Sequence, residues 1–231
     1  MTEPSSQRPA KVTREQQKAE TQRGKDFRAA FRRGARAAGW GFADDTAFRQ
    51  CGDWYVSLSS SLLWQRGALA RLAIKPMGLD PVFWEIAGLG GNETQPLSFR
   101  STGTWTLQPP SIDDRVGLDM ADVERLAGKV LDWGRRQETE RLREISIALM
   151  LATLPSEHRL GGRLRAMAIC LHILLDDLAG ARRLCGVARP DLLPGMREDG
   201  GFIMVHPDGS AATFTDLARD WTARKLSEVS G

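Results

Sequence analysis

The chain has 231 residues, of which 42% are hydrophobic and 26% are charged, and its formal net charge is +3. These fractions are close to the averages of globular proteins, which excludes a wholly disordered chain. The N-terminus has no apolar stretch of the kind that a secretory signal needs, and the longest apolar runs reach about half of the roughly 20 residues that span a bilayer. The three cysteines include no CxxC pair and leave an odd thiol, which argues against a disulfide framework and a zinc ribbon. We therefore expect a cytoplasmic protein that makes no membrane contact and holds no metal or cofactor.

The positive charge is concentrated in an N-terminal arm. Residues 1–36 hold ten Lys or Arg against four Asp or Glu. Residues 1–12 show no apolar periodicity and include two prolines, which predicts a disordered or extended tail. Regular structure is expected to start near Thr13, which fits a capping box with Gln16.

The first predicted element is a basic helix that ends near Gly39. Phe27, Phe31 and Ala35 recur at steps of four residues and mark its buried face. Gly24 weakens its middle and can break it there, because glycine costs about 1 kcal/mol relative to alanine inside a helix. Cations on the other faces form a candidate surface for nucleic acid or an acidic partner, and the ordinary alternative is a helix face that meets only water. These cations are Arg23, Lys25, Arg28, Arg32, Arg33 and Arg36.

A period of two then predicts an antiparallel sheet. Residues 54–59, 70–75 and 99–107 alternate apolar with polar side chains, and a short lead strand is expected over 47–50. One face of such a sheet packs on the core and the other is expected to meet water. The expected polar face consists of Tyr55, Ser57, Ser59, Arg71, Lys75, Arg100, Thr102, Thr104 and Thr106.

A short helix is predicted between the second and third of the long strands. Asp80 can cap this helix, Pro81 suits its first turn and Gly88 can end it. Its apolar residues are expected to cover an edge or a corner of the sheet.

The rest of the chain is predicted to be mainly helical. After Pro109 and Pro110, residues 162–175 and 178–188 flank a short turn, which predicts an antiparallel helical hairpin. The second of these helices starts with the pattern DLxxARRL and resembles the second helix of a tetratricopeptide pair. This likeness covers about 25 residues and has no second copy, so it implies shared packing and not membership of that repeat family. A β-hairpin around residues 207–209 and a last helix complete the chain.

These elements predict an α+β fold. The N-terminal basic helix and the short helix are expected to pack on a twisted antiparallel sheet, with the helical half laid against it. Residues 13–231 are predicted to form a single domain, with possible subdomains at 13–109 and 111–231.

The sequence contains no complete catalytic motif, since it has neither a phosphate-binding glycine loop nor the nucleophile elbow of α/β-hydrolases. The best catalytic pair is His172 with Asp176, which lie four residues apart and so on one face of a helix. In so apolar a segment, however, a hydrogen-bonded core histidine is the commoner outcome for His172, and Asp176 is well placed to cap the next helix. Cys51 has no neighbouring base and is expected to be unreactive. His158 and His206 are expected to be ordinary surface residues.

The polar sheet face is a candidate site for an anion, because cations and hydroxyls lie on it together. Arg71, Lys75 and Arg100 would hold the ligand, and the ordinary alternative is that these side chains meet only water. Tyr55 alone offers an aromatic ring to this face, which disfavours stacking of single-stranded RNA.

Three functions remain open after these exclusions. The leading hypothesis is a non-catalytic interaction protein of bacterial type, an adaptor, accessory subunit or immunity-type factor whose partner is another protein. The first alternative is association with nucleic acid through the basic N-terminal helix. The second alternative is an anion sensor or an unrecognised enzyme that uses the polar sheet face.

Overall fold

The computed structural model describes residues 13–63, 67–103, 105–117, 122–157, 160–186, 203–205 and 211–230. It confirms the α+β fold, with a five-stranded antiparallel sheet in the order β1–β2–β3–β4–β5. The expected tail at 1–12 and the expected turn at 207–209 lie outside these residues. Within the described ranges, no helix is long and apolar enough to cross a bilayer.

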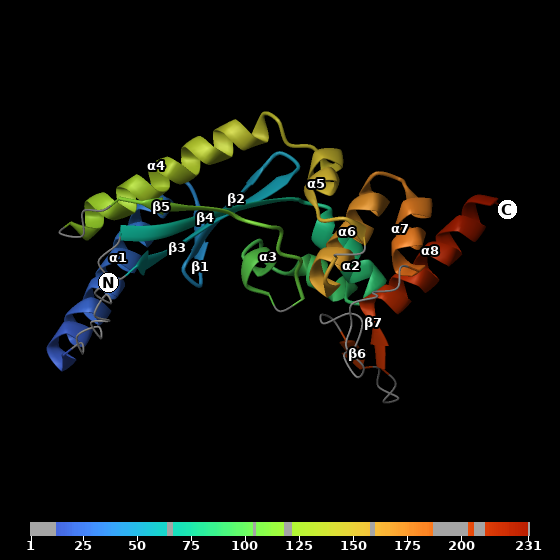
Figure 1. The fold of residues 1–231 in the computed structure, drawn as a ribbon, viewed down its shortest axis with the longest axis horizontal. Helices are drawn as coiled ribbons and strands as arrows, with labels where there is room; N and C mark the ends of the chain where they lie inside the picture. The colour runs from blue at the N-terminus through green and yellow to red at the C-terminus, as the bar shows by residue number, and fades with distance from the viewer. Residues whose placement is uncertain are drawn as a thin grey trace, which may run out of the picture.

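The elements follow one another as Figure 1 labels them. The first half of the chain contains α1 (Arg14–Ala37), β1 (Gly41–Ala43), β2 (Thr46–Cys51), β3 (Trp54–Leu63), β4 (Gly67–Pro76), α2 (Leu79–Ile86), the 3-10 helix η1 (Gly90–Thr94), α3 (Phe99–Thr102) and β5 (Ile112–Val116). The second half contains α4 (Val123–Leu142), α5 (Ile147–Thr153), α6 (Gly162–Leu174), α7 (Leu178–Gly186), β6 (Ile203–Val205), β7 (Ala211–Thr213) and α8 (Phe214–Ser230).

Helix α1 begins where the sequence predicts. Thr13 Oγ1 accepts a hydrogen bond from the Gln16 N–H at 3.2 Å, and Gln16 Oε1 accepts one from the Thr13 N–H at 2.8 Å, so the capping box is confirmed. Phe27 and Phe31 are buried on the inner face, as their spacing predicts. The helix runs unbroken through Gly24, because the modest cost of one glycine is offset by the capping box before it and by the buried residues from Phe27 onward.

The side chains of β3 and β4 divide between two faces as their period of two predicts. Val56 pairs with Ile74 across the strands, and Leu58 pairs with Leu72. These four side chains are buried under α1 and α4. Close packing of α4 on the sheet depends on Gly134, since a Cβ at that position would lie 2.4 Å from a methyl carbon of Leu58.

The buried side chains form two hydrophobic cores. The first core lies between the sheet, α1 and α4, and the second lies among α2, α6, α7 and α8. Figure 1 shows the two groups of elements at opposite ends of an elongated molecule. Because α2 belongs to the second core and α4 to the first, the cores do not follow the possible boundary between residues 109 and 111.

The C-terminal half has the predicted order of elements. Helices α6 and α7 form the helical hairpin and bury their facing sides in the second core. Strands β6 and β7 pair antiparallel, and α8 follows directly. The C-terminal β-hairpin and last helix are therefore confirmed.

The predicted strand over 99–107 is wrong. Its first part is the short helix α3, its last part has no regular structure, and the fifth strand is β5 instead. Arg100 and Thr102, which were expected on the polar face of the sheet, therefore lie in α3. Thr104 falls outside the described residues.

A buried ionic cluster explains why residues 99–107 do not form a strand. Lys75 Nζ lies 2.8 Å from Asp80 Oδ2 and donates to the carbonyl oxygens of Arg100 at 2.7 Å and Leu107 at 2.8 Å. Asp80 Oδ1 also accepts from the Leu107 N–H at 3.0 Å, and Arg100 Nη1 lies 3.3 Å from Asp80 Oδ2. We call Lys75, Asp80 and Arg100 the buried cluster. It holds this segment across the end of the sheet and satisfies its polar groups without strand pairing.

The same arrangement corrects two further expectations. Asp80 does not cap α2, whose N-cap is Gly78, because its carboxylate is committed to Lys75. The polar face of the sheet is covered at this end, where Tyr55, Ser57 and Lys75 are only 1%, 7% and 1% exposed. Burial lowers the pKa of Lys75, and the Asp80 carboxylate opposes that effect.

We predict that Lys75→Met lowers the free energy of unfolding by about 3–5 kcal/mol, because it leaves a buried carboxylate without its main partner. Urea unfolding of the full chain measures this loss. Arg71→Met is the matched control on the same strand, since the exposed pair of Arg71 with Asp113 is worth at most about 1 kcal/mol. Equal losses in the two variants would contradict the role of the buried cluster.

Candidate functional site

The outer face of α1 carries a continuous row of cations. Positions that follow one another at steps of three or four residues lie along one face of a helix. From the start of α1, six of seven positions in such a series are Lys or Arg, with Thr21 as the exception. All six side chains are exposed. We call them the basic row, which consists of Arg14, Lys18, Lys25, Arg28, Arg32 and Arg36.

The row is long and contains no acidic side chain. At 1.5 Å per residue it extends over about 33 Å of the helix axis. The acidic residues of α1 are Glu15, Glu20 and Asp26, and all three fall outside the series. Phe27 and Phe31, the large apolar residues of α1, are buried on the opposite side.

A hollow of about 400 Å³ lies beside the C-terminal part of the row. It is lined by Lys25, Arg28, Arg32, Arg33, Arg36 and Phe42, with Asp45 at its rim. Five of the six cations that were predicted from the sequence as a binding surface therefore line this one hollow.

The cations around the hollow differ in how far they are neutralised. Arg28 Nε lies 2.9 Å from Asp45 Oδ1, and the Arg32 guanidinium lies 5.9 Å from the centre of the Phe42 ring. Lys25 and Arg36 have no side-chain partner among the described residues. The hollow therefore offers at least two cations whose charges are not compensated.

Two of the six cations that were predicted as a binding surface do not belong to the basic row. Arg23 pairs with Glu20 on the same helix at 3.3 Å. Arg33 pairs with Glu124 at the start of α4, which ties the two helices together. Arg14 and Lys18 belong to the row but were not among the predicted cations, although the predicted helix start near Thr13 and the same three- and four-residue spacing identify them.

Helix α4 provides a contrast within the same molecule. Its outer positions at the same spacing include Arg125, Lys129 and Arg136, but Asp132 and Glu140 lie among them. Mixed charge of this kind is typical of a solvated helix face. The absence of acidic residues from the basic row is therefore a property of α1 that the exposed face of α4 does not share.

The three residues proposed for an anion site do not share one open surface. Lys75 and Arg100 come together in the buried cluster, with Asp80 between them. Arg71 lies four residues along β4 from Lys75, a separation of about 13 Å in a strand. Its guanidinium is exposed and pairs with Asp113 of β5 at 3.2 Å.

His172 is positioned by Asp177 and not by Asp176. His172 Nδ1 lies 2.8 Å from Asp177 Oδ2, while Asp176 has a φ of 58° in the turn between α6 and α7. Asp177 Oδ1 also accepts from the Gly180 N–H at 2.8 Å, and this bond, followed by the one with His172, lowers the pKa of Asp177. A Cβ at Gly180 would lie 2.5 Å from His172 Nδ1, so the three groups are tightly packed. The contacts are those of a helix-start cap with a buried histidine.

Cys51 also has a structural environment. Glu138 is 2% exposed and binds Arg49 with both carboxylate oxygens, and Arg49 Nε donates to Oε1 at 2.8 Å. Cys51 Sγ lies 3.0 Å from the same Oε1. Burial, followed by the hydrogen bond to Glu138, raises the pKa of Cys51 to about 11.

The remaining thiols are equally unsuited to nucleophilic chemistry. Cys170 and Cys185 are buried, and burial raises the pKa of both, to about 11 for Cys185. Among the residues that the structure describes, no three His, Cys, Asp or Glu side chains lie close enough to hold a metal ion. His158 and His206 are outside those residues.

Comparison of the chain with protein-family models, with curated proteins and with solved structures found no match. Among the described surfaces, the basic row of α1 has the most distinctive chemistry.

We predict that the native protein resists alkylation by iodoacetamide at pH 8. A thiol with a pKa of about 11 is ionised in only about one molecule in a thousand at that pH, against about a quarter for an ordinary cysteine. Mass spectrometry of the native and the urea-unfolded chain measures the labelling, and all three cysteines should react after unfolding. Rapid labelling of Cys51 in the native state would contradict the environment described for it.

Proposed function

We propose that this protein is a non-catalytic interaction protein that binds the phosphate backbone of a nucleic acid with the basic row of α1. The observation that carries the proposal is the row itself, with six exposed cations and no acidic residue in the series over about 33 Å. That length is close to the roughly 34 Å of one turn of B-form DNA. Lys and Arg that neutralise phosphates supply most of the affinity of sequence-independent binding.

The positive charge of the molecule is concentrated on α1. Helix α1 has eight Lys or Arg against three Asp or Glu, whereas the whole chain has a net charge of only +3. The rest of the molecule is therefore slightly acidic. A partner with a dense negative charge would be attracted to α1 and oriented by it.

The surroundings of the row favour a phosphate backbone over a protein surface. Interfaces between proteins usually have an apolar or aromatic centre. Here the large apolar residues of α1 are buried, and Phe42 at one end of the row lies beneath Arg32. The same lack of an exposed apolar side disfavours insertion of α1 into a membrane.

The contacts of the reactive groups support a function without catalysis. His172 is engaged with Asp177, Cys51 with Glu138, and Lys75 with Asp80. Each of these groups holds two elements together in the described part of the chain, and each thiol has a raised pKa.

We predict that the full chain binds a fluorescein-labelled random-sequence DNA duplex at low salt and that the affinity falls steeply as salt rises. For four or five phosphate contacts the slope of log K against log salt is about −3.6 to −4.5. The variant with Lys25→Glu, Arg32→Glu and Arg36→Glu should lose about 3 units of that slope, and fluorescence anisotropy at several salt concentrations measures it.

The matched control carries Lys129→Glu and Arg136→Glu on α4 and Arg143→Glu at its C-cap, which shift the net charge equally at exposed positions. It should keep nearly the full slope. The same titration with poly-glutamate separates nucleic acid from an acidic protein. No duplex binding at low salt, equal effects of the two triple variants, or a clear preference for poly-glutamate would each overturn the proposal.

A further inference from the structure

Strand β3 is longer than the strand beside it. β3 has ten residues and β2 has six, and the last pair between them joins Ser59 to Thr46. On its other side β3 pairs with β4 as far as Leu63. Residues 60–63 therefore have no strand partner on the β2 side within the described part of the chain.

A tight turn explains why β2 starts so late. Asp44 and Asp45 connect β1 to β2 in a two-residue loop, and both have positive φ, at 43° and 63°. Positive φ at both central positions is the geometry of a type I′ hairpin turn. The chain approaches β2 through this turn and not along the edge of β3, so the slot beside residues 60–63 stays unoccupied by the described strands.

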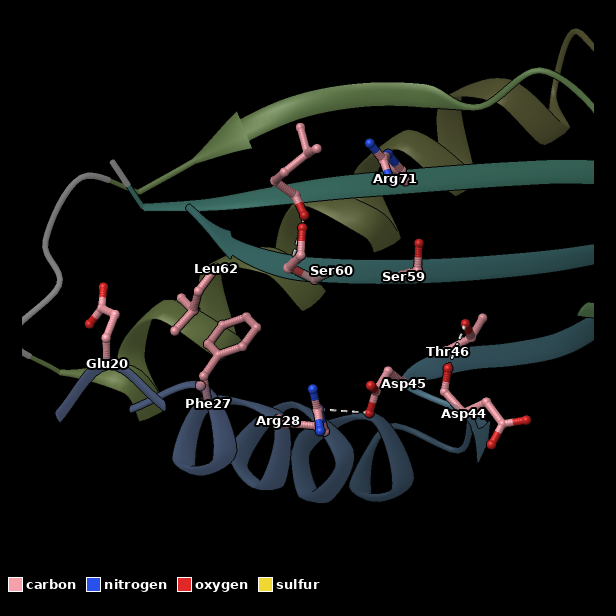
Figure 2. A pocket seen from close by; sticks show the side chains of 13 residues that line it. Glu20, Phe27, Arg28, Asp44, Asp45, Thr46, Ser59, Ser60, Leu62 and Arg71 are labelled. Atoms are coloured by element: carbon pink, nitrogen blue, oxygen red, sulfur yellow. Dashed lines mark hydrogen bonds and ion pairs between the residues drawn. The ribbon is translucent and has the colours of Figure 1, made fainter. Parts of the chain in front are cut away.

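The slot opens into a groove of about 580 Å³ between β3 and α1, which Figure 2 shows. We call it the edge groove. Leu62 and Phe27 point toward each other across one end of it, and the Asp44–Asp45 turn closes the other. Its volume lies within the range of about 300–1,000 Å³ that is usual for ligand sites.

Gly24 provides the room on the side of α1. It lies in the middle of the helix and lines the edge groove. A Cβ at this position would meet nothing within 4 Å, so the absence of a side chain is not required for packing of the described residues. Its effect is to leave the groove open.

The polar groups of the edge groove are suited to bind the backbone of an extended peptide and one basic side chain of that peptide. Arg28 is paired with Asp45 at 2.9 Å and Arg71 with Asp113 at 3.2 Å, so the two arginines are largely neutralised. Asp44 is exposed, and its carboxylate has no partner among the described residues. A cation of the occupant would complement that carboxylate.

The remaining lining supplies an apolar floor and hydroxyl groups. Phe27 and Leu62 form the apolar floor on the α1 side of the sheet, and Ser59, Ser61 and Leu69 lie on the opposite face. In a strand, alternate residues direct their N–H and C=O groups toward each neighbour. Two of the residues in 60–63 must therefore present backbone groups to the edge groove.

We infer that an extended peptide segment of a partner protein binds in the edge groove by adding a strand to β3 at residues 60–63. The backbone of the segment pairs with the free edge, an apolar side chain covers Phe27 and Leu62, and a Lys or Arg faces Asp44. An exposed strand edge is a template for pairing with another chain, and this one is bounded at one end by the Asp44–Asp45 turn. The edge groove adjoins the basic row at Arg28, which is paired with Asp45, while Lys25, Arg32 and Arg36 of the row do not line the groove.

The test uses a phage-displayed library of random linear peptides, selected on the full chain. Peptides that bind wild type should bind Gly24→Phe at least about 10-fold more weakly, because the ring fills the edge groove. Gly128→Phe on α4 is the matched control, since a Cβ there also meets nothing within 4 Å. Circular dichroism and urea unfolding confirm that both variants fold, and Gly24→Leu replaces Gly24→Phe if the larger ring prevents folding.

Hydrogen exchange then locates the bound peptide. We expect slower exchange of amides within residues 60–63 when the selected peptide is present, and weaker binding of basic peptides to Asp44→Asn. The triple variant Lys25→Glu, Arg32→Glu and Arg36→Glu should bind the peptide as wild type does, which separates this inference from nucleic-acid binding. Failure to enrich any peptide, equal binding to Gly24→Phe and Gly128→Phe, or protection elsewhere would overturn the inference. A wild-type dimer that Gly24→Phe abolishes would overturn it too, because the occupant would then be a second copy of this chain.

Discussion

The structure depends on the buried cluster of Lys75, Asp80 and Arg100, because it lies where the two hydrophobic cores meet. Lys75 is the second-last residue of β4, a strand of the first core, and Asp80 lies in α2 of the second core. The Lys75 ammonium is hydrogen-bonded to Asp80 and to the carbonyl oxygens of Arg100 and Leu107, which together can use all three of its protons. A fully bonded charge of this kind tolerates burial, whereas loss of one partner leaves a large desolvation cost. The contact between the two cores therefore depends on directional ion pairs and hydrogen bonds and not only on apolar packing.

Helix α1 contributes to three surfaces at once. Its inner face closes the first core, its outer face carries the basic row, and Gly24 and Phe27 line the edge groove. The ion pair of Arg28 with Asp45 lies where the row and the groove meet. A ligand that withdraws Arg28 from Asp45 would free that carboxylate at the rim of the groove, so the two surfaces are chemically connected even though separate residues dominate each.

The side chains that were predicted from the sequence as candidates for catalysis or ligand binding have other partners in the structure. The candidate partner of His172 was Asp176, but the turn gives Asp176 a positive φ and aligns Asp177 instead. Lys75 and Arg100 were expected to be open to a ligand, yet both are committed to Asp80. The cations of α1 were easier to predict, because their relation depends only on the period of one helix. The strand edge beside residues 60–63 left no sequence signal, since it depends on where β2 starts relative to β3.

The sequence by itself determined the elements whose character is set by neighbours within a few residues. These are the capped start of α1, the alternating strands β3 and β4, the short helix α2 and the helical hairpin. The tertiary structure determined the backbone conformation of residues 99–107 and the partial burial of the polar sheet face. Alternation along 99–107 is compatible with a strand, but the contacts to Lys75 and Asp80, more than 20 residues earlier in the chain, hold its backbone in another form. It also decided that β5, with its polar sequence, pairs at the edge of the sheet, because that pairing joins residues far apart in the chain, such as Arg71 and Asp113 at a separation of 42 residues, which no local pattern relates.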